Sequence, residues 1–239
     1  MSRPFISVIT PTYNRRNCFA AAIDCYLAQT YPLTSREWII LEDGHESVQD
    51  LLINAQAKQP DLKVRYERSD QKMTIGAKRN RLNSMATGQI IVAWDDDDYY
   101  PPDRIQHTVQ RFAANPHVEL AGSSAMYIYF QDDESIWLSG PFSPNHTTNG
   151  TLAYRASYAR HHQYDETIRF GEERSFLEDY RHSLVQLDPR KTILCIAHKE
   201  NTFLKDNIRG LGGGKQTAMQ LKDFIRTATQ RTAYKPKST

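Results

Sequence analysis

The sequence contains little cysteine. Its 239 residues include three, Cys18, Cys25 and Cys195, which cannot all pair with one another. No two of them stand at the short spacing of a cysteine-based zinc motif. The composition therefore excludes a small domain stapled by disulfides, and it favours a protein of the reducing cytoplasm.

Long apolar runs and an excess of one charge are also absent. No run approaches the ~20 apolar residues that a membrane span requires, and the first residues lack the apolar core of a signal peptide. A formal net charge of +2 gives no reason to expect a nucleic-acid partner. With 24% charged residues, the chain has the composition of one large globular domain that can bury a full core.

The most informative stretch is an apolar run that ends in four acids. Residues 90–94 are apolar and mostly β-favouring, and Asp95, Asp96, Asp97 and Asp98 follow directly. Such a strand is typical of a parallel sheet covered on both faces, and ligands bind at the carboxyl end of these strands. Four adjacent carboxylates repel one another unless a cation lies among them, and their oxygens suit Mg²⁺ or Mn²⁺. A metal site is the favoured interpretation, and a solvated acidic turn is the alternative.

The first half of the chain alternates between the two kinds of secondary structure. Strands are expected over residues 5–10, 38–41, 62–66 and 90–94, and helices over residues 16–29, 47–58, 76–86 and 103–114. This alternation predicts a parallel, Rossmann-like sheet with the strand at residues 62–66 short or at an edge. Because carboxylates follow two strands, after Leu41 and after Trp94, they should meet at one edge and form a single nucleotide site.

The second half is less regular. Strands are expected over residues 118–130, 136–138 and 192–197, with a loop over residues 139–150 and a cluster of acids, histidines and aromatics from residue 151 onward. Three glycines at residues 212–214 indicate a hinge before a last helix and a basic tail. An apolar stripe on that helix would comprise Ala218, Leu221, Ile225 and Ala228.

Five motifs, taken in order and at their intervals, resemble those of glycosyltransferase family 2, the inverting enzymes of the GT-A fold. They are ISVITPTYNR at residues 6–15, LEDG at 41–44, GAKRN at 76–80, the acids at 95–98, and Pro102. The likeness is close over roughly the first 115 residues and rests on scattered motifs beyond them.

The resemblance implies a GT-A fold, a Rossmann-like and mostly parallel α/β sheet flanked by helices, with a mixed second half. Residues 1–115 would bind the nucleotide sugar, and residues 116–208 would bind the acceptor and carry the catalytic base. Residues 209–239 would form a C-terminal helix and basic tail. That tail would dock on the core, with contact to an anionic membrane or a partner as the alternative.

On the nucleotide side, the resemblance assigns roles to three motifs. Pro11, Thr12 and Tyr13 belong to the nucleotide loop, and Asp43 would contact the base, with a helix N-cap as its alternative role. Arg79 would meet phosphate through its planar fork of donors, with a surface cation that offsets the Asp run as the alternative.

The metal would lie between Asp97 and Asp98, with His198 as a late ligand to the metal or the diphosphate. Asp95 would hold the ribose or support the metal from outside its ligands, and Asp96 belongs to the same nucleotide-binding turn. A structural histidine is the alternative for His198.

For the base, the family places paired acids after an aromatic- and glycine-containing turn. Glu172-Glu173 follows Phe170-Gly171, and Glu178-Asp179 comes later, so Glu172, Glu173 and Asp179 are all candidates. We expect Glu173 to be the base because a position in the first turn of a helix would keep it ionised, whereas Asp179 suits a solvated or ion-paired role.

Together these features predict a transferase that uses Mn²⁺ or Mg²⁺ and moves a sugar from a UDP-linked donor to a hydroxyl of a carbohydrate or glycoconjugate acceptor. One rival is a nucleotidyltransferase of related architecture, which would need a glycine-rich loop after the first strand. The other is a non-catalytic sugar-nucleotide or carbohydrate-binding module, which would not need the later acids or His198.

Overall fold

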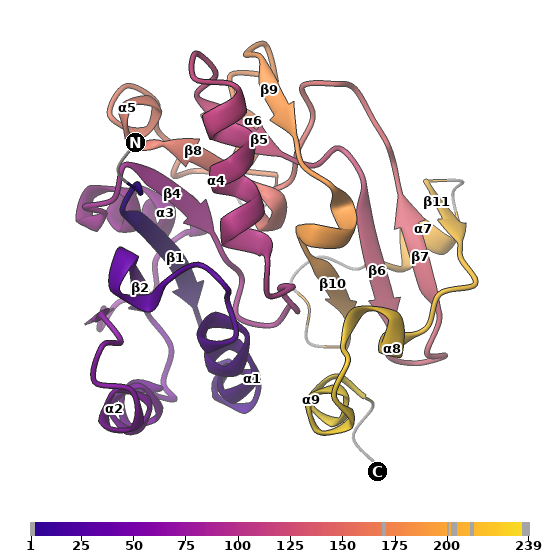
Figure 1. Cartoon of the computed structure of the whole chain (residues 1–239), viewed down its shortest axis with the longest axis horizontal. Helices are drawn as coiled ribbons and strands as arrows, with labels where there is room; N and C mark the ends of the chain where they lie inside the picture. Colours follow the sequence, from indigo (N-terminus) through magenta and orange to yellow (C-terminus); the bar gives the residue numbers. More distant parts are fainter. Residues whose placement is uncertain (1–2, 169–170, 200, 202–204, 211–212, 236–239) are drawn as a thin grey trace.

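The computed structural model describes residues 3–168, 171–199, 201, 205–210 and 213–235. Within these residues, the main sheet has seven strands in the order β3-β2-β1-β4-β8-β5-β9 (Figure 1). They are β1 (Ile6–Thr12), β2 (Arg36–Glu42), β3 (Val64–Arg68), β4 (Ile90–Ala93), β5 (Leu120–Gly122), β8 (Ala153–Arg155) and β9 (Leu184–Gln186). A second sheet has the order β10-β6-β7-β11, built from β6 (Met126–Phe130), β7 (Ile136–Ser139), β10 (Leu194–Ala197) and β11 (Gly214–Gln216).

The helices connect and cover these strands. The α-helices are α1 (Arg16–Leu27), α2 (Gln49–Lys58), α3 (Ile75–Met85), α4 (Arg104–Ala114), α5 (Ala156–Ala159), α6 (Glu173–Phe176), α7 (Asp206–Gly210), α8 (Leu221–Phe224) and α9 (Ala228–Tyr234). Three 3₁₀ turns occur at η1 (Leu33–Ser35), η2 (Asn149–Thr151) and η3 (Pro189–Lys191) among the described residues.

The alternation predicted for the first half is confirmed. Strand β1 pairs in parallel with β2 and β4, and β2 pairs in parallel with β3. Helices α1, α2 and α3 form the crossovers between these strands, and β3 lies at the sheet edge as expected. The carboxyl ends of β1, β2 and β4 therefore face the same way and lie side by side.

Side chains of the central strands alternate between two separate cores. Val8, Trp38 and Val92 pack on one face of the sheet, against α1, α2 and α4. Ile39 and Ile91 pack on the other face, against α3 and the aromatic residues of the second half. Both faces are buried, which explains why these strands read as unbroken apolar runs.

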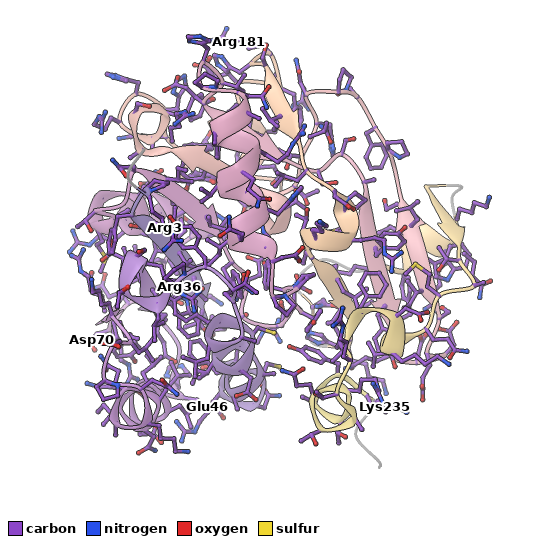
Figure 2. The ribbon with its side chains drawn as sticks, viewed as in Figure 1. Arg3, Arg36, Glu46, Asp70, Arg181 and Lys235 are labelled. Atoms are coloured by element: carbon purple, nitrogen blue, oxygen red, sulfur yellow. The ribbon has the colours of Figure 1, made fainter. Side chains whose placement is uncertain are left out.

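Charged side chains cover the outside of the molecule, and Arg36 is an exception (Figure 2). It is 1% exposed and donates to the carbonyl oxygens of Tyr26 at 3.0 Å and Gln29 at 3.1 Å, at the C-terminal end of α1. Its guanidinium also lies 4.8 Å from the centre of the Tyr26 ring. A buried cation is satisfied here by helix-end carbonyls and an aromatic face, and it fixes how α1 meets β2.

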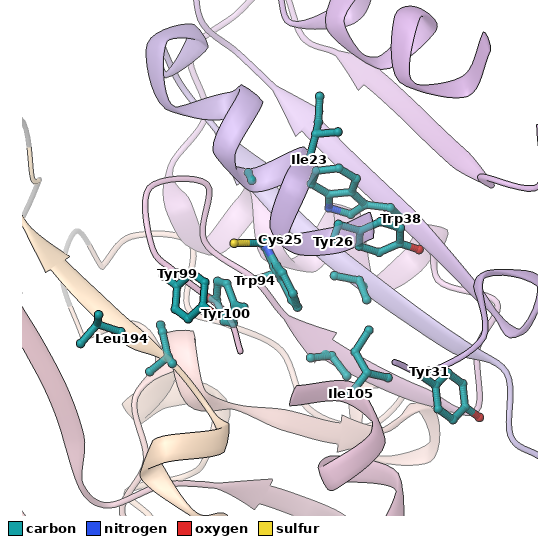
Figure 3. Packing of buried hydrophobic residues seen from close by; sticks show 14 of the residues in the cluster. Ile23, Cys25, Tyr26, Tyr31, Trp38, Trp94, Tyr99, Tyr100, Ile105 and Leu194 are labelled. Carbon is teal, nitrogen blue, oxygen red and sulfur yellow. The ribbon is translucent and has the colours of Figure 1, made fainter. Parts of the chain in front are cut away.

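Stacked aromatic rings fill the core beneath the acidic turn (Figure 3). Tyr26 stacks on Trp38 at 4.7 Å, and Trp94 stacks on Tyr100 at 3.9 Å. Tyr99 forms an antiparallel bridge with Leu194 of the second sheet. The residues on both sides of the Asp run are thus buried, and the run itself lies where the two sheets meet.

The second half differs from the sequence expectation in one strand. The prediction of one strand over residues 118–130 is wrong. The segment is broken at residues 123–125 into β5 of the main sheet and β6 of the second sheet. The Ser123 hydroxyl donates to the carbonyl of Ala125 at 2.6 Å and closes a local turn that competes with strand pairing.

The single C-terminal helix predicted from an apolar stripe is also wrong. Leu221 and Ile225 are buried as expected, but Ala218 and Ala228 are exposed, and the segment divides into α8 and α9. Thr227 caps α9 by accepting from the Gln230 N–H, so a helix start lies inside the expected helix.

The described part of the tail docks on the core. The Tyr234 hydroxyl lies 3.1 Å from the Cys25 thiol of α1, and Tyr99 donates to the Phe224 carbonyl at 3.2 Å. Of the expected glycine hinge, Gly212 lies outside the described residues and Gly214 begins β11. Among the described helices, none combines the length and apolarity that crossing a bilayer would require.

Candidate active site

A cavity of about 1470 Å³ opens at the carboxyl ends of β1, β2 and β4. Its lining includes every predicted site residue except Asp179 and His198, namely Pro11, Thr12, Tyr13, Asp43, Arg79, Asp95, Asp96, Asp97, Asp98, Glu172 and Glu173. The acids that follow β2 and β4 therefore meet at one site, as their places at strand ends predicted, and Glu172 and Glu173 of the second half line the same site.

Asp43, directly after β2, is paired with a lysine of α3. Its carboxylate accepts from Lys78 Nζ at 2.6 Å and from the Met73 N–H at 2.7 Å. Helix α2 begins after Val48 and has no side-chain cap, so the helix-cap role considered for Asp43 is wrong. Lys72 and Lys78 lie 4.1 and 5.8 Å from the centre of the Tyr13 ring. This end of the cavity thus offers a fixed carboxylate, an aromatic face and two cations.

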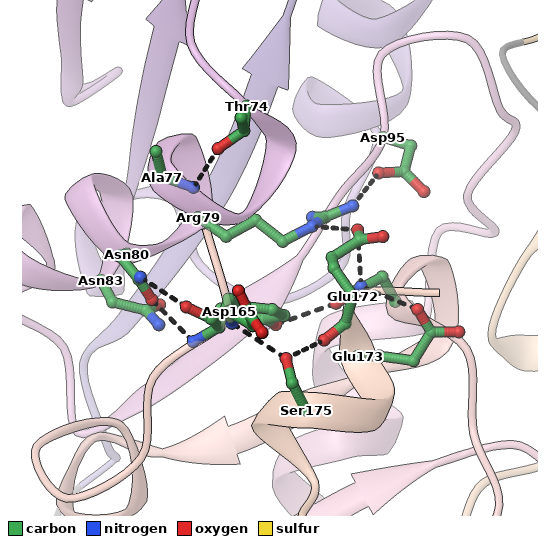
Figure 4. Close-up of polar contacts among 12 residues, drawn as sticks. Thr74, Ala77, Arg79, Asn80, Asn83, Asp95, Asp165, Glu172, Glu173 and Ser175 are labelled. Atoms are coloured by element: carbon green, nitrogen blue, oxygen red, sulfur yellow. Dashed lines mark hydrogen bonds and ion pairs between the residues drawn. The ribbon is translucent and has the colours of Figure 1, made fainter. Parts of the chain in front are cut away.

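Arg79 joins the two halves of the site (Figure 4). It is 4% exposed, and its Nε donates to Glu172 Oε1 at 2.9 Å while its Nη2 donates to Asp95 Oδ1 at 3.3 Å. Burial alone would lower the pKa of Arg79, but Glu172 and Asp95 outweigh burial and raise it. The alternative interpretation of Arg79, as a surface cation, is therefore wrong.

One nitrogen of Arg79, Nη1, has no hydrogen-bond partner among the described residues. This atom is buried, and the Arg79 side chain as a whole lines the cavity. A buried donor without an acceptor costs about 1–3 kcal/mol, so an anionic group that reached this nitrogen would remove that cost. The same guanidinium can present its planar fork to phosphate oxygens.

The four acids after β4 have different surroundings. Asp95 forms an ion pair with Arg79, and its backbone N–H donates to the Tyr100 hydroxyl at 2.8 Å. Asp96 is 7% exposed, and burial together with Asp97 raises its pKa well above the usual range. Asp98 accepts the Ile196 N–H of β10 at 2.7 Å, and burial raises its pKa to about 7.

Asp97 is the acid with most cationic and polar neighbours. Its Oδ2 lies 3.2 Å from His198 Nε2, 3.3 Å from Asn201 Nδ2 and 3.7 Å from Arg15 Nη2. Burial would raise its pKa, but the contact with His198 and the charges of Lys205 and Arg15 lower it. Asp97 is therefore held as a carboxylate.

The structure brings together only part of the predicted metal set. Asp97 and His198 are in contact, whereas Asp98 turns toward β10, and the ligand atoms of the three do not lie within 4.8 Å of one another among the described residues. Mg²⁺ and similar ions are commonly held by one or two carboxylates plus substrate phosphates. The oxygen of Asp97 and the imidazole of His198 fit such an open site, which a bound diphosphate would complete.

The paired acids Glu172 and Glu173 of the second half line the same cavity. Glu172 is held by Arg79 and by Asn149 Nδ2 at 2.8 Å. Glu173 has one weaker contact, from Asn149 Nδ2 at 3.3 Å, and burial, with the charge of Glu172 next, raises its pKa to about 7. We expected a helix N-terminus to lower the pKa of Glu173 and keep the group ionised, and this is wrong. Helix α6 has only four residues, and burial of the carboxyl raises its pKa instead.

Asp179 lies elsewhere. Helix α6 ends at Phe176, and Glu178, Asp179 and Tyr180 have positive φ angles of 48°, 58° and 59°. The Asp179 side chain is 73% exposed and forms an ion pair with Arg174 at 2.5 Å. It is not among the described residues that line the cavity.

Sequence reasoning missed Asn149, in η2. Besides its two glutamate contacts, its side-chain oxygen accepts from the Tyr164 hydroxyl at 2.8 Å. A Cβ at the neighbouring Gly150 would lie 2.9 Å from Asp95 Oδ2, so a larger residue there would displace the Asp95 carboxylate. Asn149 lay in a stretch whose Pro, Gly, Asn and Thr content indicated a loop, so its composition carried no sign of this role. Lys78 stood inside the GAKRN motif and could have been found there.

With this geometry established, the chain can be compared with known proteins. The sequence profile of Glycosyl transferase family 2 matches residues 7–177. The chain belongs to this family. The family resemblance inferred from the five motifs is therefore confirmed.

Among curated relatives, the chain is 33% identical over 104 residues to the putative colanic acid biosynthesis glycosyl transferase WcaA of Escherichia coli. The match covers 44% of this chain and 36% of that protein. It is 28% identical over 144 residues to a glucosyl-dolichyl phosphate glucuronosyltransferase of Haloferax volcanii, covering 56% of this chain and 44% of that protein. The chain thus matches less than half the length of these relatives.

Solved structures confirm the fold. A mannosyltransferase of Pyrobaculum calidifontis, in complex with GDP-Man and Mn²⁺, matches with a TM-score of 0.67 at 15% identity, over 84% of this chain and 59% of that one. TarS of S. aureus in complex with UDP matches with a TM-score of 0.65 at 15% identity, over 80% of this chain and 60% of that one. These are GT-A enzymes, so the predicted GT-A fold is confirmed.

Proposed function

We propose that this family 2 chain is an inverting, metal-dependent glycosyltransferase that moves a sugar from a UDP-linked donor to a hydroxyl of a carbohydrate or glycoconjugate. The observation that carries the proposal is one cavity lined by the cation Arg79, by Asp97, and by Glu173, whose pKa is raised to about 7.

The nucleotide would occupy the end of the cavity near β2. Asp43 presents a carboxylate already fixed by Lys78, which suits an N–H of the base, and Tyr13 offers a ring face beside it. The two structural neighbours in complex with GDP-Man and with UDP support a nucleotide sugar as the donor. The diphosphate would then lie toward Arg79, whose Nη1 would gain the acceptor it lacks.

Asp97 and His198 would hold the divalent ion, with Mn²⁺ or Mg²⁺ suited to the oxygen ligand. The bound ion would supply Lewis-acid neutralisation of the departing diphosphate. The presence of Mn²⁺ in the complex of the Pyrobaculum neighbour supports this assignment.

Glu173 would act as the general base. A group with a pKa near 7 is well matched to accept a proton at neutral pH. The acceptor hydroxyl attacks C1 of the sugar from the face opposite the diphosphate. The new O–C1 bond forms as the C1–O bond to phosphate breaks, and the hydroxyl proton passes to the Glu173 carboxylate. Glu172, fixed by Arg79 and Asn149, would position the pair rather than exchange protons.

The two rival functions are less well supported. A nucleotidyltransferase would need a glycine-rich loop after β1, and residues 11–15 contain no glycine. A binding module would not need a buried acid of raised pKa opposite the phosphate site. Release of the nucleotide from a UDP-sugar in the presence of acceptor distinguishes an enzyme from this module.

Donor binding provides the most direct test of the metal assignment. Calorimetric titration with UDP should show binding in the presence of Mn²⁺ and little binding in the presence of chelator. Asp97→Asn should abolish the metal-dependent part, whereas Asp179→Asn, an exposed control, should bind as the wild type does. Equal UDP affinity with Mn²⁺ and with chelator would overturn metal dependence.

A further inference from the structure

A second group of metal-binding side chains lies outside the cavity. Within the described residues, His162, Glu178 and His182 form the one set of histidine, cysteine and acidic side chains whose ligand atoms lie within 4.8 Å of one another. None of the three lines the donor cavity. Their side chains are 18%, 34% and 35% exposed, so an ion could enter from solvent and still be partly sheltered.

The orientation of His162 is fixed by a contact on its far side. Its Nδ1 lies 2.9 Å from the carbonyl oxygen of Tyr158, and the Tyr158 ring stacks on the imidazole at 3.8 Å. A carbonyl accepts only, so Nδ1 carries a proton, and Nε2, on the side of Glu178, is the nitrogen that could bind a metal ion. Metal-binding histidines are oriented in this way by a carbonyl or carboxylate on the other nitrogen.

We propose that His162, Glu178 and His182 bind a divalent transition-metal ion of the zinc type, separate from the ion of the donor site. Glu178 Oε2 lies 2.8 Å from His182 Nε2, and Glu178 Oε1 lies 3.8 Å from His162 Nε2. Ligand atoms about 2.1 Å from a tetrahedral zinc ion are about 3.4 Å apart, a value between these two distances. Two imidazoles and one carboxylate select such an ion over Mg²⁺, which prefers oxygen alone.

Arg181 is the competing cation. Its guanidinium contacts Glu178 Oε2, but its side chain is 68% exposed, and Figure 2 shows it at the edge of the molecule. An ion pair this exposed contributes little, so an entering metal ion can displace it at small cost. The positive φ angles of Glu178, Asp179 and Tyr180 turn the chain so that Glu178 and His182 face the same imidazole.

The metal would close a loop around the proposed base. The segment between His162 and His182 contains Glu172 and Glu173, and Tyr158 donates to the Phe176 carbonyl of α6 at 2.9 Å. A bound ion would join both ends of this segment and oppose its local unfolding. The ion is therefore assigned a structural role: it supports the side of the cavity formed by Glu172 and Glu173, without contact with substrate.

Metal stoichiometry tests the proposal on the full chain. The variant Asp97→Asn/His198→Gln removes the donor-site ligands, and competition with a chromophoric chelator should show that it still binds one equivalent of Zn²⁺. Adding His182→Gln removes a ligand, so it should weaken that affinity by more than the ~10–100-fold that loss of a partner outside the ligands costs. Adding His161→Gln, a neighbouring exposed histidine, should leave it unchanged. No zinc binding by the first variant, or equal affinity after His182→Gln, would overturn the proposal.

A second measurement needs no substitution and so avoids any folding defect. X-ray absorption of the wild-type chain loaded with one equivalent of Zn²⁺ counts the imidazoles on the metal. The proposed site supplies two, whereas the donor site supplies His198 alone among the described residues. Two imidazoles are expected, and a single one would place the zinc with Asp97 and overturn the second site.

Discussion

The two walls of the cavity are built in different ways. On the donor wall, Asp43 and Asp95 come directly after β2 and β4, so the hydrogen-bond ladder of a buried sheet positions their backbones. On the acceptor wall, Glu173 begins a helix of four residues, and contacts made by Asn149 and Tyr158 hold this region. In the proposed function, donor recognition would thus rest on a regular sheet, and acceptor activation would rest on individual side chains.

The two walls should respond differently to substitution. A side chain at the end of a paired strand can be changed with little movement of the backbone, because the ladder remains. On the acceptor wall, by contrast, contacts between side chains stabilise the backbone. A substitution on the donor wall should therefore change function with little effect on the fold. A substitution on the acceptor wall can change both.

The largest effect is expected at Glu173. Glu173→Gln keeps the shape of the side chain and its contact with Asn149 but cannot accept the proton. Since a positioned base contributes ~10²–10⁴-fold, turnover should fall by that order while UDP-sugar affinity is kept. Initial rates and calorimetry on the same preparation measure both. Normal turnover in Glu173→Gln with an inactive Asp179→Asn would show that the base lies on the exposed turn instead.

Arg79 tests whether the two walls are coupled, because it pairs with one acid from each. Arg79→Met would leave Glu172 and Asp95 without their shared cation, and breaking a buried pair costs about 3–5 kcal/mol of unfolding free energy. Chemical denaturation should show this loss. Adding Glu172→Gln should recover part of it. An unchanged midpoint in Arg79→Met would mean that the walls are held independently.

The pH dependence should come from the acceptor wall. Burial raises the pKa of Glu173 to about 7, above the usual range of a carboxyl, so the group is protonated below that pH and cannot act as a base. We expect kcat/KM to be constant above about pH 7 and to fall roughly tenfold per pH unit below it. Donor affinity measured at each pH separates this loss from titration of Asp98 on the opposite wall, whose pKa is also about 7. A flat profile between pH 5 and 8 would contradict the assignment of Glu173.

Most of the donor wall could be predicted from the sequence. Unbroken apolar strands, each followed by acids, determine both the parallel sheet and the edge at which Asp43 and the Asp run meet. These signals are local, because a strand of four to seven residues and the acid after it lie together in the chain.

The acceptor wall could not be predicted in the same way. Strands β8, β9 and β11 have three residues each, too few for a period of two to be visible. Arg79 and Glu172 are 93 residues apart, and no spacing rule joins them. The positive φ angles that end the α6 region fall on Glu178, Asp179 and Tyr180, where no glycine indicates them. Burial, which sets the pKa of Glu173, is a property of the whole fold.

The smallest effect is expected at the tail, which touches the donor half through α1. Thr227 accepts from the Gln230 N–H and starts α9, whose Tyr234 reaches Cys25. Thr227→Ala removes the cap and should lower the free energy of unfolding by about 1 kcal/mol, since N-cap substitutions typically cost that much. Thr229→Ala, at an exposed position inside α9, serves as the control and should change stability less. Because α9 lies against α1 and not against the acceptor wall, turnover should be unchanged in both variants. A clear loss of turnover in Thr227→Ala would contradict this expectation. It would show that the tail supports the active site in addition to the two walls.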